Sequence, residues 1–357
     1  MDQVMIKEYG YEYDASLDAP LWEITKCKVT HEKLWGAICL RSGRDALKTI
    51  AREYKPTIVF MPALACDSMV VPFEMYGHKV IYYRLTSNYK VDIQQVKKLV
   101  PNKEVLFLYM DYFGILSISD EELYHLKNTF TRMVFIEDRT HNLIWEKVRQ
   151  FVPDYTMASL RKWLNVPDGG LLWPKDILKK TDFAEDTSFS STRLKAQCMR
   201  RKFFTTGDQA IKTAYRKIFS TVSDIMDKDK KPSRMTAYSH SLASQANWDE
   251  IRQKRKENAK TLISILQSAN IDFIQPNAGA SDLYVAFKVI EREHKQAKLS
   301  SKGIFNTIIW PLGEKQKQIC SVAKDTEQMM LAAPCDQRYT IDDMKIIGRE
   351  MVRIFNE

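Results

Sequence analysis

The amino-acid sequence predicts an α/β protein with a large domain on a mostly parallel β-sheet, followed by a smaller α+β domain. From about Ile38 to Trp173, short β-branched or aromatic runs alternate with longer amphipathic stretches, which is typical of βαβ units. After Trp173 the pattern changes to long helical stretches and then to a second, shorter alternation. We therefore expect residues 1–235 to form the large domain and residues 236–357 the smaller one.

The first part of the chain contains six predicted strands, each apolar enough to be covered on both faces, as strands of a parallel sheet are. They are residues 57–61, 79–84, 104–110, 133–137, 155–159 and 170–173. Between them, amphipathic stretches predict helices at 44–54, 67–76, 92–99 and 120–130. Capping residues support their starts, most clearly Ser119 followed by Glu122, which forms a capping box.

The second part begins with helical stretches at about 190–228 and 248–269, separated by a charged, proline-containing loop at 227–233. Strands are predicted around 282–290 and 306–310, with a short apolar run at 329–333. The final helix, 341–355, starts at Thr340 and has Asp342 and Asp343 in its first turn. These elements predict the small α+β domain.

The composition is ordinary for a globular protein, with 45% hydrophobic and 28% charged residues in a chain of 357. The longest apolar stretch, 57–73, is interrupted by two prolines and an aspartate, so we expect neither a membrane span nor a signal peptide. The six cysteines form no C-x-x-C pair, which favours a reducing cytoplasm and no metal site.

The formal net charge of +9 is compatible with nucleic acid, a membrane surface or an anionic small molecule as partner. Much of the excess lies in residues 193–202 and 228–234, where basic and polar residues are interleaved. We interpret these stretches as an exposed basic face, because no nucleic-acid motif accompanies them.

Three segments could carry chemistry, and all lie at strand ends or helix starts, where open α/β sheets bind ligands. The first, Arg41-Ser42-Gly43-Arg44-Asp45, is a turn into a helix, and its backbone N–H groups suit a phosphate. Taken alone, it is explained better as an ordinary N-cap serine before a helix.

In the second segment an apolar strand ends in Glu137-Asp138, and His141 follows three residues after the aspartate. A carboxylate there could hold a cationic ring nitrogen in a partly dry site. A strand-terminating acid that caps the next helix is an equally good explanation at this point.

The third segment, Ser159-Leu160-Arg161-Lys162, follows a strand and precedes Gly169-Gly170. Burial there would lower the pKa of a lysine amine and make it nucleophilic toward an aldehyde. Considered by itself, the lysine is better explained as part of a surface Arg-Lys pair.

Taken together, the order and spacing of the three segments resemble fold-type I pyridoxal-phosphate (PLP) enzymes, which have the aspartate-aminotransferase fold with a seven-stranded sheet. The sequence is most similar to the DegT-like branch, known for sugar aminotransferases that act on nucleotide-linked keto-sugars. In that branch the second segment reads Asp-x-x-His or Asp-x-x-Gln, as in Asp138 and His141. Tyr112-Phe113-Gly114 and the stretch from Pro334 to Tyr339 also resemble it, so the likeness covers the chain from about Arg41 to its end.

The resemblance implies a role for each matching residue. Lys162 would hold the cofactor and then move the proton between substrate carbon and cofactor carbon. Asp138 would pair with the pyridinium nitrogen, and His141 would lie near the phenolic oxygen of the ring. Ser159 and the backbone at Ser42-Gly43-Arg44 would hold the phosphate.

The sequence departs from the pattern of the branch in three places. Cys66 stands at the apparent position of an aromatic residue that stacks on the cofactor ring, and a sulfur packs there more weakly. Lys162 follows Ser159 after only three residues, a spacing closer to the cysteine-desulfurase-like branch. Arg44 replaces the usual small polar residue of the phosphate turn. These departures predict a divergent subgroup.

The resemblance implies an aminotransferase that moves an amino group from an amino acid, plausibly glutamate, to a keto-sugar or related carbonyl compound. Two alternatives stay open: other PLP chemistry such as lyase, desulfurase or decarboxylase activity, with Cys320 and Cys335 as candidate thiols, and a non-catalytic binding role. Analogy with fold-type I enzymes also implies a homodimer. Arg161, Arg193 and Arg338 are the candidate anion-binding groups for a substrate.

Overall fold

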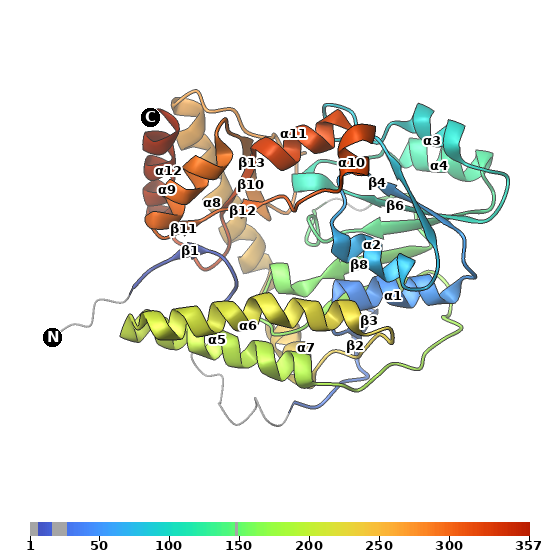
Figure 1. Cartoon of the computed structure of the whole chain (residues 1–357), viewed down its shortest axis with the longest axis horizontal. Helices are drawn as coiled ribbons and strands as arrows, with labels where there is room; N and C mark the ends of the chain where they lie inside the picture. Colours follow the sequence, from blue (N-terminus) through green and yellow to red (C-terminus); the bar gives the residue numbers. More distant parts are fainter. Residues whose placement is uncertain (1–5, 16–26, 147–148) are drawn as a thin grey trace.

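The computed structural model describes residues 6–15, 27–146 and 149–357 and is built around one large sheet (Figure 1). The strand order of this sheet is β2-β3-β9-β8-β7-β6-β4-β5. Its strands are β2 (Lys33–Leu34), β3 (Ala37–Leu40), β4 (Ile58–Pro62), β5 (Lys79–Tyr83), β6 (Val105–Met110), β7 (Met133–Asp138), β8 (Tyr155–Ser159) and β9 (Gly170–Pro174). The prediction of a large sheet in the first part of the chain is confirmed.

The five strands from β8 to β5 run parallel, whereas β9 is antiparallel to both its neighbours. The mostly parallel sheet is therefore confirmed, with seven main strands and the two-residue β2 as an eighth at the edge. All six residues of β6 are buried, as expected for a central strand covered on both faces. The sequence patterns did not single out β2 and β3 as strands.

Each parallel strand is followed by a helix or a tight turn. The helices are α1 (Gly43–Glu53), α2 (Asp67–Glu74), α3 (Ile93–Leu99) and α4 (Asp120–Thr129), with short 3-10 helices η2 (Tyr112–Gly114) and η3 (Leu160–Lys162). Ser42 and Asp92 cap α1 and α3, and the predicted capping box of α4 is present. The predicted helix starts therefore lie within one residue of the observed ones.

The second part of the chain begins with two long helices that lie side by side, α5 (Ser188–Thr206) and α6 (Gln209–Lys228) (Figure 1). The single predicted stretch 190–228 is broken at Gly207, which has a positive φ of 68° and ends α5. The helices α7 (Ala237–Gln245) and α8 (Trp248–Ser268) follow.

A second sheet of order β10-β13-β12 is antiparallel. Its strands are β10 (Tyr284–Lys288), β12 (Thr307–Ile308) and β13 (Met330–Pro334), and the helices nearby are α9 (Arg292–Ser301), α10 (Glu314–Ile319), α11 (Ser321–Met329) and α12 (Ile341–Phe355). A separate apolar core joins this sheet to α8 and α12. The N-terminal strand β1 (Tyr9–Gly10) pairs with β11 (Ile304–Phe305), so the start of the chain lies against the C-terminal part (Figure 1).

The prediction of an exposed basic face at residues 193–202 is wrong for two of its three arginines. Arg193 and Arg200 are each only 1% exposed. The guanidinium of Arg193 lies 5.0 Å from the ring centre of Phe219, and that of Arg200 lies 4.9 Å from the ring centre of Phe204. Aromatic faces and a carboxylate at Glu12 compensate the charges, so this face of α5 is part of the interior.

Among the described residues, no helix is both long enough and apolar enough to cross a membrane.

Candidate active site

The carboxyl ends of β6, β7 and β8 border a pocket that also contains the N-terminus of α1. Six of the eight residues predicted for the site line this pocket: Gly43, Arg44, Cys66, Asp138, Ser159 and Lys162. His141 contacts Lys162, which lines the pocket. Ser42 lies in the turn before α1, directly before the pocket residue Gly43. The sheet thus brings together three segments of the sequence that extend from Gly43 to Lys162.

The parallel register explains why Asp138 and Ser159 meet. Asp138 is the last residue of β7 and is aligned with Met110 of β6 and Met157 of β8, both of which also line the pocket. Ser159 ends β8, and Lys162 ends the one-turn helix η3 that follows. Because parallel strands end at the same edge of the sheet, residues at their ends share one pocket.

The turn before α1 packs against β9 so closely that it needs a glycine there. A Cβ on Gly170 would lie 2.1 Å from the carbonyl oxygen of Ser42. The side chain of Ser42 is buried, donates to Asp45 Oδ2 over 2.7 Å and accepts from the Asp45 N–H. The hydroxyl of Ser42 therefore serves as the helix cap, and only the backbone of this turn is available to a ligand.

The carboxylate of Asp138 is buried and makes few compensating contacts. Its Oδ1 accepts from the N–H of Thr140 over 2.8 Å. Burial raises the pKa of Asp138, although the Thr140 hydrogen bonds and the nearby Lys162 amine act in the opposite direction. A carboxylate in this position gains free energy from a cationic partner, such as a protonated ring nitrogen.

The amine of Lys162 faces the imidazole of His141, with 3.2 Å between Nζ and Nε2. Burial lowers the pKa of Lys162, against the opposing effects of Cys66 and Asp138. Burial, reinforced by the lysine charge, also lowers the pKa of His141 well below its usual value. The site therefore favours a neutral imidazole and raises the fraction of unprotonated, nucleophilic amine.

Aromatic rings hold His141 in place from three directions. The ring centres of Phe113, Tyr284 and Trp310 lie 5.8, 6.2 and 6.3 Å from that of His141. His141 is only 2% exposed, and its Nδ1 has no hydrogen-bond partner. This packing explains the desolvation that keeps the imidazole neutral.

Trp310 is a pocket residue that the sequence motifs did not predict. It follows β12, lines the pocket, and its ring centre lies 5.9 Å from Lys162 Nζ. Cys66 lines the same pocket, with its sulfur 2.8 Å from Ser68 Oγ. The pocket thus contains an aromatic ring from the C-terminal part of the chain, although Cys66 stands at the expected position of one.

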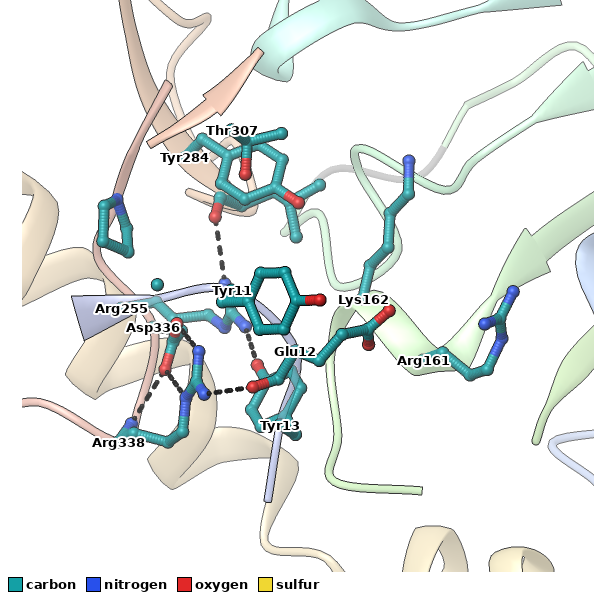
Figure 2. Close-up of a pocket in the computed structure, with 13 residues that line it drawn as sticks. Tyr11, Glu12, Tyr13, Arg161, Lys162, Arg255, Tyr284, Thr307, Asp336 and Arg338 are labelled. Carbon is teal, nitrogen blue, oxygen red and sulfur yellow. Dashed lines mark hydrogen bonds and ion pairs between the residues drawn. The ribbon is translucent and has the colours of Figure 1, made fainter. Parts of the chain in front are cut away.

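A second pocket adjoins the first, and Arg161 and Lys162 line both (Figure 2). The N-terminal segment contributes Glu12 and two tyrosines, and the C-terminal part contributes Tyr284, Thr307 and several charged groups. The second pocket therefore provides space for a further molecule next to the lysine.

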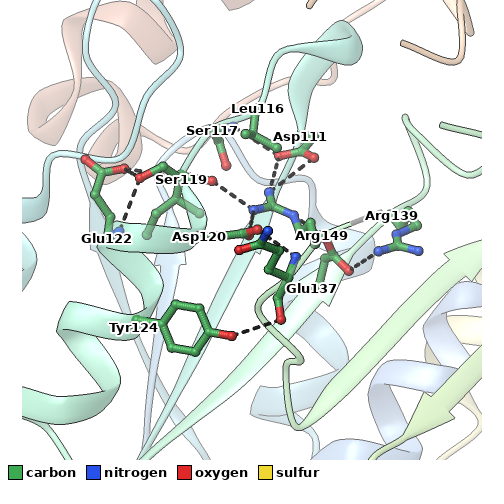
Figure 3. A network of polar contacts seen from close by, with 12 residues as sticks. Asp111, Leu116, Ser117, Ser119, Asp120, Glu122, Tyr124, Glu137, Arg139 and Arg149 are labelled. Atoms are coloured by element: carbon green, nitrogen blue, oxygen red, sulfur yellow. Dashed lines mark hydrogen bonds and ion pairs between the residues drawn. The ribbon is translucent and has the colours of Figure 1, made fainter. Parts of the chain in front are cut away.

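A buried arginine, Arg149, is bonded to carboxylates that lie close in the sequence or in space to the predicted site residues (Figure 3). Arg149 lies 2.8 Å from Glu137 Oε1 and donates to Asp111 Oδ1 over 3.1 Å. Glu137 directly precedes Asp138, and Asp111 is hydrogen-bonded by Asn142, which directly follows His141. This network therefore contacts the chain on both sides of the predicted site residues.

The neutral state of His141 predicts a pH-dependent stability. The imidazole titrates near pH 6.5 in the unfolded chain, whereas in the folded protein it stays neutral to lower pH. The contribution of His141 to the free energy of unfolding is therefore fully present above pH 6.5 and is lost as the pH falls below that value. Between pH 7.5 and 5.5 the wild type should lose about 1.4 kcal/mol more unfolding free energy than His141→Gln. Urea unfolding of both proteins at both pH values measures this; parallel losses would contradict a buried neutral imidazole.

No protein-family model matches the sequence, and no curated protein matches it significantly. Solved structures do match in fold. One, assigned as the sugar aminotransferase Spr1654 from Streptococcus pneumoniae, has a TM-score of 0.70 at 14% identity, covering 98% of each chain. Another, PseC from Helicobacter pylori, an aminotransferase involved in the biosynthesis of pseudoaminic acid, has a TM-score of 0.66 at 15% identity, covering 98% of this chain and 100% of PseC.

A NifS-like protein matches less well, with a TM-score of 0.57 at 14% identity over 90% of this chain and 82% of its own. At these identities the likeness shows the fold. The predicted aspartate-aminotransferase fold, and the resemblance to DegT-like aminotransferases at the level of fold, are confirmed.

Proposed function

We propose that this chain is a PLP-dependent aminotransferase that moves an amino group from an amino-acid donor to a keto-sugar or a related carbonyl acceptor. One observation carries the proposal: a buried carboxylate, Asp138, and a lysine amine of lowered pKa, Lys162, line one pocket next to the N-terminus of a helix. The pocket lies at the carboxyl edge of the sheet, where this class of fold binds ligands.

The residues present fit PLP. The amine of Lys162 suits the aldehyde of the cofactor, and the carboxylate of Asp138 suits the ring nitrogen. The backbone at Gly43 and the hydroxyl of Ser159 suit the phosphate, because α1 directs its positive end into the pocket. The buried Nε1 of Trp310 has no hydrogen-bond partner, so the pocket also contains a donor without an acceptor.

PLP, when bound, supplies an electron-withdrawing ring that stabilises negative charge on the substrate carbon. The residues of the chain then have distinct tasks. Lys162 Nζ carries the proton to and from the substrate carbon, because it is the amine that borders both pockets. Asp138 holds the proton on the ring nitrogen, and neutral His141 orients Lys162 Nζ.

The acceptor and the donor are proposed from the similar structures. Spr1654, assigned as a sugar aminotransferase, has been solved in PLP and PMP forms, and PseC is an aminotransferase involved in the biosynthesis of pseudoaminic acid. We propose glutamate as donor, a homodimer as assembly and the cytoplasm as location. We also propose that residues 1–235 form the cofactor-binding domain and residues 236–357 the smaller one.

The position of two cysteines argues against desulfuration. Cys320 and Cys335 are 1% and 0% exposed, and both sulfurs contact backbone carbonyls. A catalytic thiol has to reach the substrate as a thiolate, and burial raises the pKa of Cys335. Neither Cys320 nor Cys335 is therefore placed to act as a catalytic thiol, which favours amino transfer over a desulfuration that uses either of them.

The proposal is tested with purified protein and added PLP. The protein should become yellow, and reduction with borohydride followed by peptide mapping should place the cofactor on Lys162. Added glutamate should then bleach the yellow band and release 2-oxoglutarate. Absence of a yellow band, or unchanged spectra with every amino acid tested, would contradict an aminotransferase.

Asp138→Asn is expected to separate catalysis from stability. An amide keeps the acceptor for the Thr140 N–H but lacks the negative charge that holds the proton on the ring nitrogen. We expect kcat to fall by about 10²–10³-fold. Because burial already raises the pKa of Asp138, loss of its charge should leave the melting temperature of the cofactor-free protein equal or higher. Steady-state kinetics and thermal unfolding check the two parts; an unchanged kcat would remove Asp138 from the mechanism.

A further inference from the structure

We infer that the guanidinium of Arg161 neutralises the phosphate of the cofactor. This inference rests on the proposed function and adds a residue to its site. The sequence contains three candidate anion-binding arginines, Arg161, Arg193 and Arg338, and their contacts in the structure differ.

Two of these arginines already have carboxylate partners. Arg338 donates to both oxygens of Asp336, over 2.8 and 2.9 Å, and Arg193 lies 2.7 Å from an oxygen of Glu12. An anion that recruited either of them would leave a carboxylate without its counter-charge in a partly dry site. Arg338 lines the second pocket, which we call the outer pocket, and neither of these two arginines is free to bind a ligand.

A fourth arginine in the outer pocket is also fully used. Arg255 donates from Nε to Gln337 and from Nη2 to the hydroxyl of Tyr13, each over 2.9 Å. Its Nη1 faces the carbonyls of Asp282 and Leu283, and it is 0% exposed. Figure 2 shows this cluster bonded within itself, whereas no dashed line reaches Arg161.

Arg161 differs from the others in lacking an anion. Within the described part of the chain, no carboxylate lies at ion-pair distance from its guanidinium, and its Nε is buried without a hydrogen-bond partner. Its guanidinium lies 5.7 Å from the ring centre of Phe189. Because an arginine stays charged in proteins, the cation is held in a partly buried place without compensation.

The electrostatic surroundings agree with this geometry. Burial, together with the charges of Arg193 and Arg44, lowers the pKa of Arg161 to about 9, although the charge of Glu12 acts in the opposite direction. Such a lowering measures how unfavourable the charge is where no anion is present. A bound dianion would reverse that penalty, and a guanidinium can bind it through two parallel hydrogen bonds.

The place of Arg161 selects the phosphate of the cofactor over an acidic group of the substrate. On the inner side Arg161 shares the pocket with Gly43 and Ser159, where the N-terminus of α1 adds further positive potential. On the outer side the guanidinium groups of Arg255 and Arg338 are already bonded to other partners. Both effects favour an anion on the inner side.

The test compares two aldehydes that differ only in the phosphate, PLP and pyridoxal. Both are titrated into cofactor-free protein, and the absorbance of the bound aldehyde gives the dissociation constant. Arg161→Gln should weaken PLP binding by about 10- to 100-fold and change pyridoxal binding less than about 2-fold. Arg161→Lys keeps the positive charge but cannot form two parallel hydrogen bonds to the phosphate. Its affinity for PLP should therefore lie between those of the wild type and Arg161→Gln. Arg349→Gln, on the exposed face of α12, is the control and should bind both aldehydes like the wild type.

The possible outcomes test the role of Arg161 and the proposed function separately. Equal losses for PLP and pyridoxal, or an unchanged affinity for PLP, would overturn the role of Arg161 while leaving the proposed function in place. A loss confined to phosphate-bearing substrates would likewise assign Arg161 to the substrate and overturn the inference. A wild type that binds neither aldehyde would refute the proposed function itself. Melting temperatures of the cofactor-free variants show whether a loss comes from unfolding.

Discussion

Lys162→Ala is expected to lower kcat by about 10⁴-fold or more, the largest effect of any single substitution in this chain. The substitution removes both the amine that attaches the cofactor and the group that carries the proton next to the outer pocket. Turnover of glutamate with a keto-sugar acceptor measures the loss. Borohydride reduction followed by peptide mapping should find labelled peptide in the wild type and none in the variant.

The matched control is Lys175→Ala, which removes an exposed lysine just after β9 and should keep full activity and labelling. Unfolding should not explain the loss in Lys162→Ala. The pKa of Lys162 is lowered in the fold, so below pH 10.5 the unfolded chain binds the proton more tightly and the lysine destabilises the folded state. A variant of normal melting temperature that still carried the label at the same peptide would refute the assignment of Lys162.

The residues that could be predicted from the sequence share a simple property: each belongs to a short local motif at the end of a strand. Asp138 closes an apolar strand, and Ser159 and Lys162 follow the next one, so their convergence needs only a parallel sheet. The N-cap at Ser42 was predicted for the same reason, because capping depends on residues three apart. Local pattern and sheet geometry together were sufficient for these residues.

The residues that could not be predicted come from distant segments. Trp310 enters the pocket from the segment just after β12, and Tyr284 contacts His141 from β10, although no motif in either segment predicts the site. The pairing of β1 with β11 depends likewise on the packing of both ends of the chain. Such contacts are set by tertiary packing, which the periodicity of one segment does not encode.

The burial of basic residues was the clearest error, and it has the same origin. The amphipathic pattern of α5 predicts a polar face, but it does not tell whether a second layer covers that face. Here α6 and the N-terminal segment cover it, and Glu12 and aromatic rings compensate Arg193 and Arg200. Among the arginines that line the two pockets in the described part of the chain, Arg161 is the one that we propose to bind a ligand.

The second large effect is expected from Arg149→Met, which should lower the free energy of unfolding by about 3–5 kcal/mol. The side chain of Arg149 is 3% exposed and is shared by Asp111, Asp120 and Glu137 (Figure 3). Methionine fills a similar volume but leaves the carboxylate of Asp111 buried without its cation, and leaves Glu137 with Arg139 alone. Urea unfolding at neutral pH measures the loss, with Arg353→Met, an exposed ion pair on α12, as the control that should change little.

The pH dependence of the Arg149→Met deficit distinguishes lost charge compensation from lost packing. Burial already raises the pKa of Asp111, and loss of Arg149, the main opposing charge, should raise that pKa further. An acid of raised folded pKa binds its proton more tightly in the folded state, so acidification restores stability to the variant. The difference from the wild type should therefore shrink as the pH falls from 7 toward 5, whereas a packing defect would stay constant. Glu137 directly precedes Asp138, and Asn142 directly follows His141. The variant should therefore also lose kcat at the pH where its loss of stability is greatest. Such a loss would show that Arg149 positions the site as well as stabilising the fold.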